Sequence, residues 1–200
     1  MNNLKNRERK LKQIEKEVIA LNSSPLCCER ILSGSKPVIG EGSVMSEIMF
    51  IGEAPGKKEA LTGRPFCGSA GRVLDELLSY INISRDDVYI TNIVKDRPEN
   101  NRDPSPEEIV MYAPFLDRQI EIIQPRIIVT LGRFSMDYIL KRFCNEISIP
   151  SIGEAHGRKY ITKLSYGEVV IVPLYHPAAS IYNQKLKKTL LRDIKILKKM

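Results

Sequence analysis

EIMFIG at residues 47–52 is a short apolar run that ends in glycine, and it predicts a buried strand. Three further strand-like runs follow it: DVYITNIV (87–94), RIIVTLG (126–132) and GEVVIVPLYHP (167–177). Between them, apolar residues recur at helical spacing in 69–81, 105–123 and 135–143. Strands that are apolar on both faces and alternate with helices indicate a sheet covered on both sides. We therefore expect an α/β fold, a three-layer α/β/α sandwich with a central, mainly parallel four-stranded sheet.

The flanking segments complete one domain over residues 1–200. We expect an N-terminal helix over 4–21 and a loop over 22–46, because the latter is rich in Gly, Ser and Pro and Pro25 ends the helix. The α/β core spans 47–184, and a basic helix closes the chain over 185–200. Within the core, Ser105 and Pro106 are expected to begin a helix that Pro114 kinks.

Composition excludes several classes of protein. Hydrophobic residues make up 42% of the 200 residues and charged residues 28%, which is typical of a globular chain. No apolar run approaches a membrane span, and no signal core is visible, so we expect a cytoplasmic or nucleoid-associated protein whose four cysteines are thiols. The net charge of +7 gathers at the two ends. Basic ends indicate either a grip on a polyanion or ordinary solvated helix faces.

Chemistry is expected where strands end, because parallel sheets bind ligands beyond their carboxyl ends. Glu53 lies between two glycines, Asn92 and His176 each follow a strand, and Phe66 lies in a glycine-rich loop. Each residue alone has a structural explanation, as an ion pair, a turn, a satisfied histidine or a core side chain. Together they predict a pocket for a planar polar ring, with an aromatic face to stack on it and an amide to bind its edge.

The same four residues suit cleavage of an N-glycosidic bond. A histidine can stabilise a departing anion, and a carboxylate can position water or stabilise an oxocarbenium ion. The dinucleotide fingerprint and the P-loop are both missing from the sequence. With two histidines in the chain, a zinc site built on histidines is not expected.

Four longer motifs carry a family resemblance: GEAPGKKEALTGRPFCGSAGRVLDELL, TNIVKDRPENNRDPSPEEI, PRIIVTLGR and HPAA. In order and spacing the chain resembles the type 4 uracil-DNA glycosylases from about Cys28 to its C-terminus. The resemblance implies two catalytic residues, Glu53 and His176. It implies substrate-binding roles for Gly52, Ala54, Glu59, Phe66 and Asn92, in which Phe66 stacks on uracil, Asn92 reads it and Glu59 helps to exclude the thymine methyl group.

DNA contacts are expected from basic residues and from the loop after His176. Arg64, Arg97 and Arg102 would hold phosphates, and Ile181 is the expected apolar wedge. The resemblance implies a monofunctional enzyme of base excision repair that leaves an abasic site. Two alternatives stay open: an inactive or weak member that binds uracil or DNA, and a glycosylase for another deaminated base. Uracil-containing DNA is the expected partner, a replication clamp is a candidate partner, and a monomer is expected.

One departure from the family concerns its 4Fe-4S cluster, which four cysteines usually hold. Those positions here are Pro25, Cys28, Asp96 and Tyr112, so Cys28 is the one retained ligand. We therefore expect no cluster, no metal and no other cofactor. Glu59 is followed by Ala60 where the family often has a second carboxylate, so one carboxylate of this loop is lost.

Overall fold

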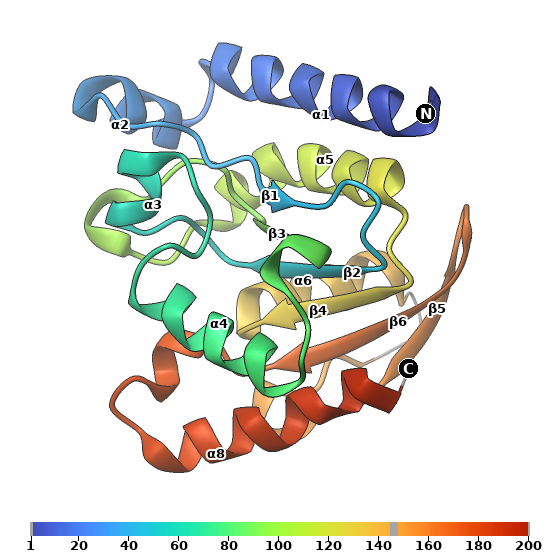
Figure 1. The fold of residues 1–200 in the computed structure, drawn as a ribbon. Helices are drawn as coiled ribbons and strands as arrows, with labels where there is room; N and C mark the ends of the chain where they lie inside the picture. Colours follow the sequence, from blue (N-terminus) through green and yellow to red (C-terminus); the bar gives the residue numbers. More distant parts are fainter. Residues whose placement is uncertain (1, 145–147, 200) are drawn as a thin grey trace.

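The computed structural model describes residues 2–144 and 148–199, and its centre is one sheet of six strands (Figure 1). The strands lie in the order β1-β3-β2-β4-β6-β5. Four of them are the expected parallel strands: β2 (Ile48–Gly52), β3 (Tyr89–Asn92), β4 (Ile127–Leu131) and β6 (Gly167–Leu174). The expected sandwich is confirmed, but the number of strands is wrong by two.

The two additional strands are antiparallel and form the edges of the sheet. β1 (Glu41–Gly42) pairs with β3, and β5 (Tyr160–Leu164) pairs with β6. The sequence pattern did not reveal either strand. β1 has two residues, and β5 alternates between half-buried and exposed side chains, whereas the central strands are mostly buried.

Helices cover both faces of this sheet and give it two apolar cores. On one face, residues of α1 (Asn2–Ala20), α5 (Pro106–Ile123) and α6 (Arg133–Phe143) join strand residues such as Met49 and Ile51. On the other face, α4 (Ser69–Tyr80), α8 (Gln184–Asp193) and η4 (Ile194–Lys199) pack against strand residues such as Phe50. The alternation of Met49, Phe50 and Ile51 between the two cores follows from the two-residue period of a strand.

Shorter elements complete the chain, and two of them correct the expected loop over 22–46. α2 (Pro25–Ser33) begins there, capped by Ser24, so Pro25 starts a helix rather than ending the preceding one, and β1 follows. The remaining elements are α3 (Lys57–Thr62), η1 (Arg85–Asp87), η2 (Glu99–Asn101), α7 (Ile152–Ala155) and η3 (Pro177–Ser180).

The start of α5 agrees with the prediction from the sequence, whereas the end of the C-terminal helix does not. Ser105 and Glu108 form a capping box at the start of α5, as the serine predicts, and Pro114 lies inside that helix. The basic C-terminal helix is shorter than expected, because α8 ends at Asp193 and the chain continues as η4. No helix among the described residues is both long and apolar enough to cross a membrane.

Strand order fixes where a ligand can bind. Consecutive strands β2 and β3 lie on one side, and β4 and β6 lie on the other, so the order reverses between β2 and β4. A crevice opens beyond the carboxyl ends of strands at such a reversal. Gly52, Asn92 and Leu131 end three of these strands, and His176 follows β6 by two residues.

Candidate functional site

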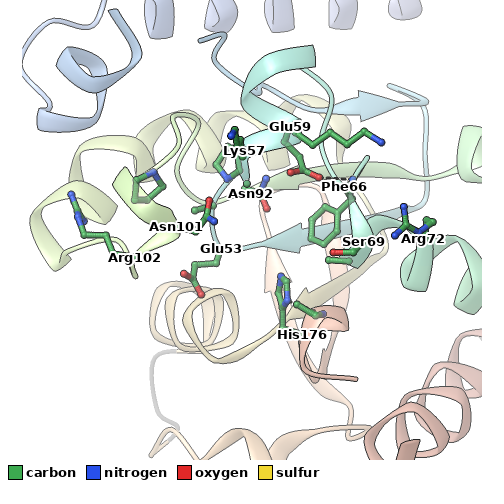
Figure 2. A pocket seen from close by; sticks show the side chains of 18 residues that line it. Glu53, Lys57, Glu59, Phe66, Ser69, Arg72, Asn92, Asn101, Arg102 and His176 are labelled. Carbon is green, nitrogen blue, oxygen red and sulfur yellow. Dashed lines mark hydrogen bonds between the residues drawn. The ribbon is translucent and has the colours of Figure 1, made fainter. Parts of the chain in front are cut away.

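A pocket of about 550 Å³ lies at this edge of the sheet. Figure 2 shows the ring of Phe66 between Asn92 and His176, with Glu53 on one side and Arg72 on the other. The sequence predicted seven residues that line it: Glu53, Ala54, Glu59, Phe66, Asn92, Arg102 and His176. Residues that come from four separate segments of the chain therefore meet in one cavity.

Gly52 does not itself line the pocket, but its lack of a side chain lets two lining residues meet at the end of β2. Its Cα pairs with that of Asn92 in the parallel ladder. A Cβ at Gly52 would lie 2.3 Å from Asn92 Oδ1 and 2.6 Å from Phe66 Cζ. Glycine here lets the amide and the aromatic ring approach the end of the strand together.

Asn92 carries an amide that is buried and available for a ligand. The residue is 1% exposed, and its Oδ1 has no hydrogen-bond partner among the described residues. Its main chain is fixed by a second residue, because Lys95 Nζ donates to Asn92 O at 2.6 Å. A buried polar atom without a partner is costly, so it indicates a group that a ligand satisfies.

Phe66 is held in an unusual backbone conformation. Its φ is +46°, and its ring lies 5.8 Å from the ring of His176. Glu59 fixes this loop, because Glu59 Oε1 accepts from the main-chain N–H groups of Cys67 at 2.9 Å and Gly68 at 2.7 Å. At Gly71 a Cβ would lie 1.8 Å from the carbonyl oxygen of Phe66, so α4 can pack here only with glycine.

His176 is a neutral imidazole at neutral pH. Burial lowers its pKa to about 4, because the site favours the uncharged ring. Its Nδ1 accepts from the N–H of Ala178 at 3.2 Å, so the proton of the neutral ring is on Nε2. Gly132, with φ of +96°, brings the end of β4 against this side chain; a Cβ there would lie 3.1 Å from His176 Cβ.

Glu53 titrates near neutral pH. Burial first and the charge of Asp103 second raise its pKa to about 7, while Arg133 opposes the shift. Arg133 and Asp103 form an ion pair of 3.3 Å beside it. A carboxylate near neutrality in a pocket suits acid, base or electrostatic roles in catalysis.

The expected DNA contacts are spread more widely. Arg102 lines the pocket and binds Glu108 at 2.6 Å, whereas Arg64 lies outside it and binds Glu41 at 2.7 Å. Arg97 donates to Asn101 at 2.8 Å. Ile181 is partly buried against the core that contains α8, while its neighbour Tyr182 is 98% exposed.

Several lining residues were not identified from the sequence. The polar ones and one proline are Lys57, Lys58, Ser69, Arg72, Asn101 and Pro98. A usable signal exists, because the lysines open α3, and Ser69 and Arg72 lie in the first turn of α4, directly after glycine-rich loops. Lys95, the candidate weighed for a Schiff base, is fully buried and does not line the pocket.

The positions of the family's cluster ligands do not fit an iron-sulfur group. Tyr112 donates to Asp96 at 2.6 Å, so the two side chains bind each other, and both are buried. Cys28 is exposed, and Pro25 opens α2. Within 2–144 and 148–199, no group of three or more His, Cys, Asp or Glu could hold a metal ion.

Comparison with known proteins agrees with this geometry. The family model of the uracil DNA glycosylase superfamily matches residues 39–196, and the chain belongs to that superfamily. Among curated proteins it is similar to the type-4 uracil-DNA glycosylase of Sulfurisphaera tokodaii, with 45% identity over 191 residues, 95% of this chain and 84% of the relative. The type-4 enzyme of Saccharolobus solfataricus is 47% identical over 162 residues, 80% of this chain and 74% of the relative. That of Archaeoglobus fulgidus is 41% identical over 168 residues, with 84% and 83% covered.

Proposed function

We propose that the protein is a uracil-DNA glycosylase of base excision repair. It flips uracil out of DNA, hydrolyses the N-glycosidic bond and leaves an abasic site. The observation that carries this proposal is the buried amide of Asn92, whose Oδ1 has no partner in the described part of the chain and lies in a pocket that also holds Phe66 and His176. A planar base with polar edges satisfies the amide and stacks on the ring.

Substrate recognition uses groups that the fold holds still. Phe66 stacks on the uracil ring, and the Asn92 amide binds its polar edge. Gly52 leaves room for the Asn92 amide and the Phe66 ring to lie together beneath the base, and Ala54 adds a small side chain to the pocket lining. Glu59 lines the pocket as well, and we assign to its side chain the exclusion of a methyl group on C5.

Catalysis divides between His176 and Glu53. The neutral His176 donates from Nε2 to the uracil oxygen on which negative charge develops as the C1′–N1 bond breaks. Glu53, once ionised, stabilises the positive charge on the sugar and positions the water that attacks C1′. The proton of that water passes to the carboxylate, and uracil leaves as an anion that solvent protonates.

DNA is held around the mouth of the pocket. Arg102 lines it, with the exposed side chains of Lys57 and Lys58, whereas the exposed Arg64 and the half-buried Arg97 lie outside the pocket lining. Such side chains bind phosphates. Tyr182 reaches solvent where Ile181 is packed, so we assign contact with the opened base stack to Tyr182, and the wedge role of Ile181 becomes secondary.

The enzyme is proposed to be monofunctional and to work without a cluster or other cofactor. Lys95 Nζ is bound to Thr91, Asn92 and Gln119, so it is not free to form a Schiff base. A single domain, a monomeric state, a replication clamp as partner and a cytoplasmic or nucleoid location stay predictions. Binding without turnover and preference for another deaminated base are the two alternatives that the experiment below separates.

The test is cleavage of a labelled oligonucleotide with one uracil, revealed by alkali, with EDTA present and with thymine and hypoxanthine controls. Cleavage at uracil alone supports the proposal. Asn92→Ala and His176→Ala should each lower the rate by at least about 100-fold, whereas His156→Gln should not. His156 is a matched control because its Nδ1 binds Asp193 at 2.6 Å and it does not line the pocket. DNA binding without cleavage would instead support the inactive alternative.

A further inference from the structure

A buried polar network occupies the place where the relatives' cluster ligands would lie. Tyr112 of α5 donates to Asp96 Oδ2 at 2.6 Å, and Arg30 Nε of α2 lies 3.6 Å from Asp96 Oδ1. Exposure of the three residues is 0%, 1% and 7% in that order. Two of the three, Asp96 and Tyr112, stand at expected ligand positions, and Arg30 lies two residues after Cys28, another of these positions.

Arg30 extends this network to a fourth segment. Its Nη1 donates to Val18 O at 3.2 Å and its Nη2 to Ile19 O at 3.0 Å. These carbonyls belong to the last turn of α1. Carbonyl groups there have no hydrogen-bond donor within the helix, and they carry the partial negative charge of the helix dipole. One guanidinium therefore joins α1 and α2 to the segment after β3, and Tyr112 joins that segment to α5.

The segment that Asp96 anchors forms one wall of the pocket. Residues 93–104 connect β3 to α5, and Pro98, Asn101 and Arg102 line the cavity. Other contacts secure its two ends, because Lys95 binds the carbonyl of Asn92 and Arg102 binds Glu108. Asp96 is the fixed point between these ends.

We propose that the Arg30–Asp96–Tyr112 network replaces a metal cluster as the device that holds segment 93–104 and so positions this wall of the pocket. A buried carboxylate needs both a hydrogen-bond donor and a counter-charge, and the network supplies one of each. In this network Tyr112 is a positioning residue and touches no substrate. Of the measurements that test this proposal, only the cleavage rate depends on the proposed function; iron content and hydrogen exchange do not.

A second Tyr–Asp–Arg group in the chain provides a matched control. Tyr138 donates to Asp117 at 2.6 Å, and Arg142 binds the same carboxylate at 2.8 Å. These residues join α5 to α6, and none of them lines the pocket. Tyr138→Phe therefore removes the same kind of hydrogen bond as Tyr112→Phe at a place where the pocket should not respond.

The experiment compares the two tyrosine variants in the purified full chain. The wild type should contain less than about 0.1 iron per chain and show no absorbance band near 400 nm, where such clusters absorb. Tyr112→Phe should raise hydrogen exchange in residues 93–104 and lower the single-turnover rate about fivefold to tenfold, measured well below the melting temperature. Tyr138→Phe should lower the melting temperature by a similar few degrees and leave both readouts at wild-type values.

Three results would overturn the proposal. They are stoichiometric iron and sulfide in the wild type, equal rates for the two variants, or unchanged exchange in 93–104. The effects of Asp96→Asn and Tyr112→Phe on the rate should not add in the double variant, because each substitution alone already disrupts the same hydrogen bond. If the wild type fails to cleave uracil DNA, the proposed function fails, while iron content and hydrogen exchange still decide the network.

Discussion

The raised pKa of Glu53 predicts the pH dependence of the reaction. Burial and the charge of Asp103 raise that pKa to about 7, and catalysis needs the ionised form. The ionised fraction is then about 1% at pH 5 and about 90% at pH 8, so the single-turnover rate should rise about 90-fold between them. His176 does not titrate in this range, because its pKa is lowered to about 4 by burial.

The assay is single-turnover cleavage of uracil DNA at constant ionic strength from pH 5 to 9. Asp103→Asn should move the inflection to lower pH, because it removes a negative charge and frees Arg133 to stabilise the carboxylate. Arg133→Gln should move it to higher pH. Glu53→Gln should be slow and without the inflection. A flat wild-type profile, or the same inflection in Glu53→Gln, would refute the assignment.

The raised pKa of Glu53 also predicts how the stability of the fold changes with pH. A carboxyl group whose pKa is raised on folding keeps its proton longer in the folded state, so its ionisation destabilises the fold as pH rises from about 4.5 to about 7. Glu53→Gln should therefore raise the melting temperature at pH 8 and leave it nearly unchanged at pH 4. Calorimetry at the two pH values checks this, and a gain at pH 4 alone would contradict it.

Four further substitutions test the pocket and its surroundings. Tyr182→Ala should weaken binding to uracil DNA about tenfold in a gel-shift assay, the scale of one base–aromatic stack, whereas Ile181→Ala should mainly lower the melting temperature. Gly52→Ala should lower the cleavage rate about 100-fold, because the new Cβ at residue 52 displaces the Asn92 amide. A rate near wild type would show that Asn92 and Phe66 can shift without loss of activity. Lys95→Met should lower the cleavage rate about tenfold and leave DNA affinity unchanged, because it releases the carbonyl of Asn92; equal loss of affinity would speak against this role.

The four parallel strands, and the meeting of the residues that follow them, could be predicted from the sequence because each strand has a local apolar pattern. Four apolar runs define the parallel strands, and the residues that follow them converge because parallel strands end at one edge. Glu53, Asn92 and His176 were identifiable for this reason. Phe66 was identifiable from its place in the glycine-rich loop, but its left-handed backbone conformation, with φ of +46°, has no local signal.

What the sequence could not reveal depends on partners that are distant along the chain. Arg64 looks like a free cation, but it binds Glu41 on an edge strand of two residues. Asp96 looks like a simple loss of a cysteine, and only the fold shows Arg30 and Tyr112 around it. Such contacts join residues 16 to 66 positions apart, beyond any pattern of helix or strand period.

The carboxylate of Glu59 limits how this enzyme could evolve a broader range of bases. It faces the pocket and also holds the Phe66 loop through the N–H groups of Cys67 and Gly68. A mutation at Glu59 that admits a larger base therefore also loosens the aromatic platform on which any base must lie. Acceptance of a new base is more accessible by mutation of Asn101 or Pro98, two other lining residues at which a side chain can change without releasing Phe66.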